Sequence, residues 1–310
     1  MRILVYDKNP QRYVEALREA GVEDEITAAD DAQEAREAMG ETEVLLGWQV
    51  PPGLLSRAPR LRWIQSTGVG IDDIVRSPIP PTVTVTHVLA EHYGREITQY
   101  VFAELLYRVR DLHRVRRLQA ERSWEPFLTG TLAGQKLGVA GLGAIGSEIA
   151  RVGRAFHMEI TGLSRTGDGR GVVERAYTPR DWIPFVSDLD VLVLILPLTR
   201  ETRHQVDASV LSAMKPSSLL VNVGRGAVVD EAALVEALRA GRPAGAILDV
   251  FETEPLPRES PLWNLPGVTL EPHMAGPSHV DEVTAFFVKN LERYRTGEPL
   301  LGRVDLSRQY

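Results

Sequence analysis

The sequence contains no cysteine, and this absence excludes a thiol nucleophile, thiolate zinc ligands and disulfide bonds. Long apolar runs are also missing, since the longest, Val191 to Leu196, is far shorter than the ~20 residues that cross a bilayer. The first residues, Met1 to Asp7, have the pattern of a strand and lack the apolar core of a secretion signal. We therefore expect a soluble cytoplasmic protein with no membrane partner.

Charge of one sign is not concentrated anywhere in the chain. The formal net charge of −7 is diffuse, and no cluster of Lys and Arg predicts a nucleic-acid partner. The one basic stretch, Arg108 to Arg117, alternates with Leu112, Val115 and Leu118 at helical spacing. This spacing is typical of a solvated helix face rather than of a binding patch.

A length of 310 residues predicts two domains. Short apolar runs alternate with helical patterns throughout, which indicates α/β architecture with doubly wound parallel sheets. In the first block the strand candidates are Ile3–Tyr6, Glu25–Ala28, Val44–Trp48, Arg62–Ser66 and Val83–Val88. In the second they are Lys136–Ala140, Glu159–Leu163, Val191–Leu196, Leu219–Val223, Ala244–Asp249 and Val268–Glu271. We expect one long helix, Arg95–Arg117, between the blocks, and a last helix, Asp281–Thr296, that packs on the first domain.

A glycine pattern follows the first strand of the second block. The sequence Gly141-Leu142-Gly143-Ala144-Ile145-Gly146 lies between the strand KLGVA and the helical SEIARVGRAF. In that context G-x-G-x-x-G permits a tight turn, close approach of a pyrophosphate and close packing of helix on strand. We predict dinucleotide contacts from Gly141, Gly143, Ala144, Ile145 and Gly146, against the alternative of a purely structural turn. Leu196, Pro197 and Val223 end neighbouring strands and are expected to join them.

The next strand ends without a carboxylate, in Leu163-Ser164-Arg165-Thr166. A carboxylate here would bind the ribose 2′-hydroxyl of NAD, whereas hydroxyl and guanidinium groups accept a 2′-phosphate. We therefore predict that Ser164, Arg165 and Thr166 bind NADP in preference to NAD. The alternative is that Arg165 points into solvent.

Three charged or titratable residues stand just beyond other strands: Arg225, Glu254 and His273. Their chemistry fits hydride transfer to a 2-oxo acid, because reduction develops negative charge on the carbonyl oxygen, which histidine is suited to protonate. A carboxylate such as Glu254 would fix the imidazole tautomer, and the guanidinium of Arg225 would bind the substrate through its fork. Taken singly, His273 is more simply a structural histidine and Glu254 a turn residue.

The motifs GLGAIG, NVGRGAVVDEAAL, ILDVFETEPLP and SPLWNLPGVTLEPH together resemble the D-isomer specific 2-hydroxyacid dehydrogenase family over nearly the whole chain. Within it, WQVPPGLL, STGVGID, LSRTG and the ending GEPLLGRVDLSRQY are similar to the NADP-linked glyoxylate/hydroxypyruvate reductase A group. Where many relatives have Ile-Gly or Ile-Ala after the histidine, this chain has Met274-Ala275-Gly276, which puts local cofactor contacts in doubt.

The resemblance implies two flavodoxin- or Rossmann-like domains with the cofactor in a cleft between them. Residues 1–92 would begin a substrate-binding domain, 93–275 would form the dinucleotide-binding domain, and 276–310 would return to the first. It further implies that Arg225 binds substrate, that Glu254 partners an acid–base His273, and that Asp249 lies near the nicotinamide amide. The turn Gly68-Val69-Gly70 would hold the substrate carboxylate, with Trp48 nearby, although strand geometry and core packing also explain these residues.

We accordingly expect an NADPH-preferring reductase of a small 2-oxo acid that gives the D-2-hydroxy acid, and a homodimer formed through the long helix. Two alternatives stay open: a phosphoglycerate- or lactate-type dehydrogenase, and a dinucleotide-sensing protein without catalysis. The other histidines share no metal-ligand spacing, so neither a metal nor a catalytic role is predicted for them. They are His87, His92, His113, His157, His204 and His279.

Overall fold

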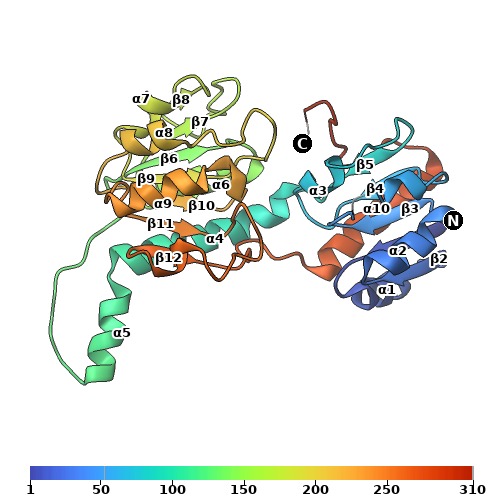
Figure 1. The fold of residues 1–310 in the computed structure, drawn as a ribbon, viewed down its shortest axis with the longest axis horizontal. Coiled ribbons are helices and arrows are strands. Elements are labelled where there is room, and N and C mark those ends of the chain that lie inside the picture. Colours follow the sequence, from blue (N-terminus) through green and yellow to red (C-terminus); the bar gives the residue numbers. More distant parts are fainter. Residues whose placement is uncertain (52, 309–310) are drawn as a thin grey trace. The chain divides into compact units, whose positions relative to one another are not determined.

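The computed structural model describes residues 1–51 and 53–308, without the side chains of residues 91 and 92. Pro52, in the WQVPPGLL motif, and the last two residues of the chain lie outside the description. The chain divides into two compact units, residues 1–90 with 278–310 and residues 91–277 (Figure 1). Each is a parallel α/β sheet with helices on it, as predicted.

The first unit has five parallel strands in the order β2-β1-β3-β4-β5. They are β1 (Arg2–Tyr6), β2 (Glu25–Ala29), β3 (Val44–Gly47), β4 (Trp63–Gln65) and β5 (Thr84–Thr86). Every residue of β3 and β4 is buried, as expected for parallel strands covered on both faces. The helices are α1 (Pro10–Glu19), α2 (Ala32–Ala38), α3 (Asp72–Val75) and α10 (Val280–Thr296), with short 3-10 turns at Met39–Glu41 and Leu55–Arg57.

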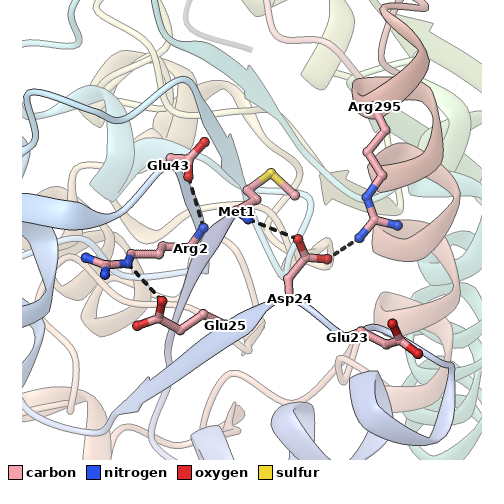
Figure 2. A pocket seen from close by; sticks show the side chains of 7 residues that line it. All are labelled: Met1, Arg2, Glu23, Asp24, Glu25, Glu43 and Arg295. Atoms are coloured by element: carbon pink, nitrogen blue, oxygen red, sulfur yellow. Dashed lines mark hydrogen bonds and ion pairs between the residues drawn. The ribbon is translucent and has the colours of Figure 1, made fainter.

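Helix α10 belongs to the first unit although it comes last in the chain. Its Phe287, which is fully buried, stacks on Trp63 of β4 with ring centroids 5.0 Å apart. Near the end of the same helix, Arg295 pairs through its guanidinium with Asp24, which also pairs with the Met1 ammonium (Figure 2). These residues line a hollow at the amino ends of β1 and β2. Ligands of open α/β sheets bind instead at the carboxyl ends of the strands. The ion pair of Asp24 and Arg295 in this hollow joins α10 to the chain before β2.

The second unit has seven parallel strands in the order β12-β11-β10-β9-β6-β7-β8. They are β6 (Lys136–Ala140), β7 (Glu159–Leu163), β8 (Arg175–Tyr177), β9 (Val191–Leu194), β10 (Leu219–Asn222), β11 (Gly245–Leu248) and β12 (Val268–Leu270). Its helices are α4 (Ala90–Val109), α5 (Leu112–Glu121), α6 (Ala144–Ala155), α7 (Trp182–Val186), α8 (Ala208–Ala213) and α9 (Glu231–Arg239), with 3-10 turns at Gly226–Val228 and Pro261–Asn264. The strand order changes side at β6, which pairs in parallel with β7 on one side and with β9 on the other.

The single long helix expected over Arg95–Arg117 is wrong. The chain forms α4 and α5 separately, because Asp111 adopts a left-handed backbone with φ 51° that a continuous helix does not allow. Nor is the basic stretch wholly solvated, since Arg108 donates a hydrogen bond to the Gly267 carbonyl at 3.0 Å.

Helix α5 and residues 122–131, which we call the arm, extend from α4 and return to it (Figure 1). The return is fixed where the Gly130 N–H donates to the Val109 carbonyl at 2.9 Å. Across the arm, the Arg114 guanidinium lies 4.2 Å from the centre of the Phe127 ring. In the described part of the chain, no helix combines the length and apolar character that a membrane span requires.

Candidate active site

The glycine turn joins β6 to α6 at the point where the strand order changes side. Gly141 has φ 107°, a conformation that favours glycine, and its N–H donates to the Leu163 carbonyl of β7 at 2.8 Å. A Cβ on Gly146 would overlap the Gly141 carbonyl, whereas a Cβ on Gly143 would meet open space. The turn therefore presents its backbone and the start of α6 to an unobstructed region, as a pyrophosphate requires.

The tip of β7 carries the residues expected at the ribose. Ser164 is held by its N–H to the Tyr177 carbonyl at 3.0 Å and by its hydroxyl to the Asp168 carbonyl at 3.0 Å. Arg165 and Thr166 are exposed. A carboxylate does follow, at Asp168, but it accepts the Arg170 N–H at 2.8 Å and is thereby engaged by its own loop.

The ends of β9 and β10 are ordered by side chains that sequence reasoning missed. The Thr202 hydroxyl donates to the Pro197 carbonyl at 2.6 Å, next to half-buried Leu196. Val223 is buried, and its N–H donates to the Leu194 carbonyl at 3.1 Å. The expected cofactor residues at these strand ends thus stand on fixed backbone. The sequence around Leu196 and Pro197 does not indicate that Thr202 holds the Pro197 carbonyl.

Arg225 stands on a turn built by Asn222, which is 1% exposed and was also missed. The Asn222 Oδ1 accepts the Gly224 N–H at 3.2 Å, and its Nδ2 donates to the Arg225 carbonyl at 3.0 Å. Gly226 brings the turn against the chain after β11, because a Cβ there would overlap the backbone of Phe251. Glycine is therefore required at Gly226 by close approach of two backbones.

Glu254 and His273 come together although 19 residues separate them. The His273 Nδ1 and Glu254 Oε2 are 2.8 Å apart, and the Phe251 N–H donates to the other carboxylate oxygen at 3.0 Å. Burial raises the pKa of Glu254, but these hydrogen bonds and the charges of His273 and Arg225 outweigh it, so the net shift is downward. Glu254 is therefore a stable carboxylate, with Arg225 close enough to act on it.

Asp249 holds the backbone around His273 through hydrogen bonds. Its carboxylate, 2% exposed, accepts the N–H groups of Met274 at 2.7 Å and Ala275 at 3.1 Å. Its own carbonyl accepts the His273 N–H at 2.9 Å. Burial raises the pKa of Asp249, and this effect outweighs the lowering of the pKa by the two amides and by the charge of His273. Since His273 has φ 53°, an uncommon conformation for a residue with a side chain, Asp249 holds the backbone that aims the imidazole.

Residues 102–275 match the family model described as D-isomer specific 2-hydroxyacid dehydrogenase, NAD binding domain. The chain belongs to this family. Among curated relatives, glyoxylate reductase of Aeropyrum pernix is 40% identical over 242 residues, covering 74% of this chain and 72% of the relative. Glyoxylate/hydroxypyruvate reductase A of Escherichia fergusonii is 30% identical over 271 residues, covering 86% of each.

Solved structures of dehydrogenases of this family superpose over nearly the whole chain. The NADPH-dependent glyoxylate/hydroxypyruvate reductase of Sinorhizobium meliloti, in complex with NADP and sulfate, has a TM-score of 0.88 at 28% identity, covering 100% of this chain and 99% of that one. The D-isomer specific 2-hydroxyacid dehydrogenase of Xanthobacter autotrophicus, with NADPH and MES, has a TM-score of 0.87 at 32% identity, covering 99% of both. The predicted family and fold are therefore confirmed.

The turn expected to meet the substrate lies in the first unit of this 2-hydroxyacid dehydrogenase. The Ser66 hydroxyl accepts the Gly68 N–H at 3.2 Å and donates to the Gly70 carbonyl at 3.2 Å, which closes the turn. Gly68 is buried with Val69 and Gly70 half-buried beside it. A Cβ on Gly68 would lie 3.4 Å from the Trp48 ring. The structure thus brings Trp48 and the turn together within one unit.

Substitutions in the glycine turn should affect stability and NADPH binding separately. Gly146→Ala forces a Cβ into the Gly141 carbonyl and should destabilise the protein by about 1–3 kcal/mol or more. Gly143→Ala meets open space at φ −74° and should leave the unfolding temperature unchanged, yet weaken NADPH binding at least ~10-fold by crowding the phosphates.

Thermal unfolding and calorimetric titration of both variants test this prediction, with Gly40→Ala as the control, because Gly40 also meets open space but lies in the first unit. Unchanged NADPH affinity in Gly143→Ala would show that the turn does not carry the cofactor.

Proposed function

We propose that this chain reduces a small 2-oxo acid of the glyoxylate or hydroxypyruvate type to the D-2-hydroxy acid, using NADPH. The observation that carries the proposal is the 2.8 Å pair of His273 and Glu254, with Arg225 near enough to lower the pKa of the same carboxylate. All three follow strands of the sheet that bears the glycine turn. Relatives named glyoxylate or hydroxypyruvate reductases support the choice of substrate.

The residues present fit a dinucleotide. Gly141, Gly143 and Gly146 leave the backbone open where a pyrophosphate would approach, and α6 begins there with Ala144 and Ile145. Residues at the other strand ends would complete the contacts: Ser164, Arg165, Thr166, Leu196, Pro197, Val223 and Asp249. A bound nicotinamide supplies the hydride that reduces the carbonyl carbon.

Each residue of the catalytic set has a defined task. The guanidinium of Arg225 binds the carboxylate and carbonyl oxygen of the substrate and holds the carbon in place. The imidazolium of His273 donates its proton to the carbonyl oxygen as negative charge develops there. Glu254, ionised because its pKa is lowered, accepts the hydrogen bond of His273 Nδ1 and fixes the orientation of the ring.

We further infer that residues 91–277 serve as the dinucleotide-binding domain and that the first unit serves as the substrate-binding domain. The N–H groups of the turn Gly68-Val69-Gly70 would bind the substrate carboxylate, and the indole of Trp48 would limit the size of the substrate side chain. Support comes from the closed turn and from the Trp48 ring against it.

Replacement of the catalytic set tests the reaction. With NADPH and hydroxypyruvate, His273→Asn should lower kcat at least ~10²-fold, because the proton donor is lost. Arg225→Lys should mainly raise the KM for the 2-oxo acid, since it keeps the charge but loses the fork.

His157→Asn replaces a histidine that also has a positive φ, 60°, and should behave as wild type. The substrate panel adds glyoxylate, pyruvate and 3-phosphohydroxypyruvate. Faster turnover of either of the last two would assign a lactate- or phosphoglycerate-type enzyme, and no turnover of any would contradict catalysis.

We propose a preference for NADPH on the basis of the tip of β7. Arg165 is exposed beside the hydroxyl groups of Ser164 and Thr166, while the nearby Asp168 carboxylate is engaged by the Arg170 N–H. Structures of relatives contain NADP or NADPH. Cation and hydroxyl groups together suit a 2′-phosphate better than a ribose hydroxyl.

Arg165→Gln should therefore raise the KM for NADPH about 10-fold or more, because a charge-assisted hydrogen bond to the 2′-phosphate is lost. The KM for NADH should change by less than about twofold. Arg239→Gln, an exposed arginine on α9, is the control. A wild-type enzyme with a lower KM for NADH than for NADPH would contradict the preference.

We infer that two copies associate through α4 and the arm. The arm exposes 95% of Trp124 and 100% of Leu128, and Leu112 and Val115 of α5 are also exposed. Large apolar side chains gathered on one projecting segment are typical of an interface between proteins. A second copy of the chain is the partner that α/β dehydrogenases of this family suggest.

The replacement of Trp124 and Leu128 by Ser should convert a dimer into a monomer of 34.3 kDa in sedimentation equilibrium. Ile183→Ser, at a side chain 45% exposed elsewhere in the same unit, should remain dimeric. A monomeric wild-type protein at micromolar concentration would contradict the inference.

A further inference from the structure

A second polar cluster lies outside the catalytic set and links the three loops that follow β9, β10 and β11. It consists of His204, Glu231 and Glu252. The Glu252 Oε1 is 2.9 Å from His204 Nε2 and accepts the Glu231 N–H at 3.0 Å. In return, Glu231 Oε2 accepts the Glu252 N–H at 3.2 Å. The Glu252 carboxylate therefore contacts the other two loops, through the His204 ring and the Glu231 N–H.

The cluster is attached to the loops that carry the catalytic set. Glu252 is two residues before Glu254, and its neighbour Phe251 donates its N–H to the Glu254 carboxylate at 3.0 Å. Glu231 begins α9, which follows the turn of Arg225. His204 also joins that turn through its backbone, since its N–H donates to the Ala227 carbonyl at 2.9 Å.

We propose that His204, Glu231 and Glu252 form a clasp that positions Arg225 and Glu254 relative to one another. The inference rests on the proposed function of those two residues. Gly226 permits the clasp, because only a residue without Cβ allows the Arg225 turn to touch the Phe251 backbone. The three members are positioning residues, since they act through the loops that carry Arg225 and Glu254.

The His204 ring completes the contacts of the two carboxylates. Glu231 and Glu252 are joined by backbone N–H to carboxylate hydrogen bonds of 3.0 and 3.2 Å. Burial raises the pKa of Glu231, and although the hydrogen bond from the Glu252 N–H lowers this pKa, the charge of Glu252 adds to the upward shift. The Nε2 atom of His204 lies 2.9 Å from Glu252 Oε1 and gives this carboxylate a hydrogen-bond partner on a third loop. With that partner removed, the Glu252 backbone is free to move away from Glu231, and Glu254 moves with it.

His204→Asn is the test, because Asn tolerates the left-handed backbone of His204, φ 53°, while removing the ring. With hydroxypyruvate and NADPH we expect kcat to fall about 10-fold through misplacement of Glu254, and the KM for NADPH to stay unchanged. His157→Asn, at φ 60° in the same unit, should change neither.

Two readouts separate positioning from a merely structural effect. In a Glu254→Gln background, His204→Asn should lower kcat less than about twofold, because residues that act through one another are not additive. Hydrogen exchange at residues 251–254, measured on the NADPH complex, should become faster in His204→Asn and not in His157→Asn.

A 10-fold loss that persists in the Glu254→Gln background would overturn the clasp, as would unaltered exchange at 251–254. A wild-type protein that turns over no 2-oxo acid would instead overturn the proposed function. The exchange measurement requires no turnover, so it would still decide whether the clasp holds the Glu254 loop.

Discussion

The contact between His273 and Glu254 is the interaction on which the rest of the site depends. Their 2.8 Å approach joins the chain after β12 to the chain after β11, two neighbouring strands with the same direction. Because parallel strands release their chains at one edge, residues distant in sequence meet there without a long loop. The seven-stranded order then brings the Arg225 turn next to them, since β10 pairs with β11. Sheet topology thus does most of the assembly.

Topology alone does not orient a side chain, and here that task falls to buried polar residues that hold the backbone. Asn222 closes the turn of Arg225, and Asp249 holds the two amides that follow His273. A buried carboxylate that accepts several N–H groups fixes backbone strongly, because any departure would leave polar groups unpaired. The positive φ of His273 is maintained by this arrangement.

The sequence predicts the parts of this structure that follow from local pattern. Eleven of the twelve strands, the glycine turn and the position of Arg225, Glu254 and His273 at strand ends were recognisable from apolar runs and their flanking residues. The break at Asp111 was not, because the helical spacing of apolar residues continues across it and only the left-handed φ reveals the change of direction. The strand β8 was not recognisable, because its sequence Arg-Ala-Tyr is not an apolar run and none of its residues is buried. Asn222 and Asp249 were not recognised as supports, because their contacts depend on the path of the folded chain.

The clasp shows why weak polar contacts suffice at such an edge. A half-exposed pair such as His204 and Glu252 adds little to stability, at most about 1 kcal/mol. Its effect on geometry is larger, because Glu252 also exchanges backbone hydrogen bonds with Glu231 and stands two residues from Glu254. Small displacements of a reacting group reduce rates steeply, whereas stability responds to the whole core. An interaction that contributes almost nothing to folding is therefore well placed to determine how closely Arg225 and Glu254 approach one another.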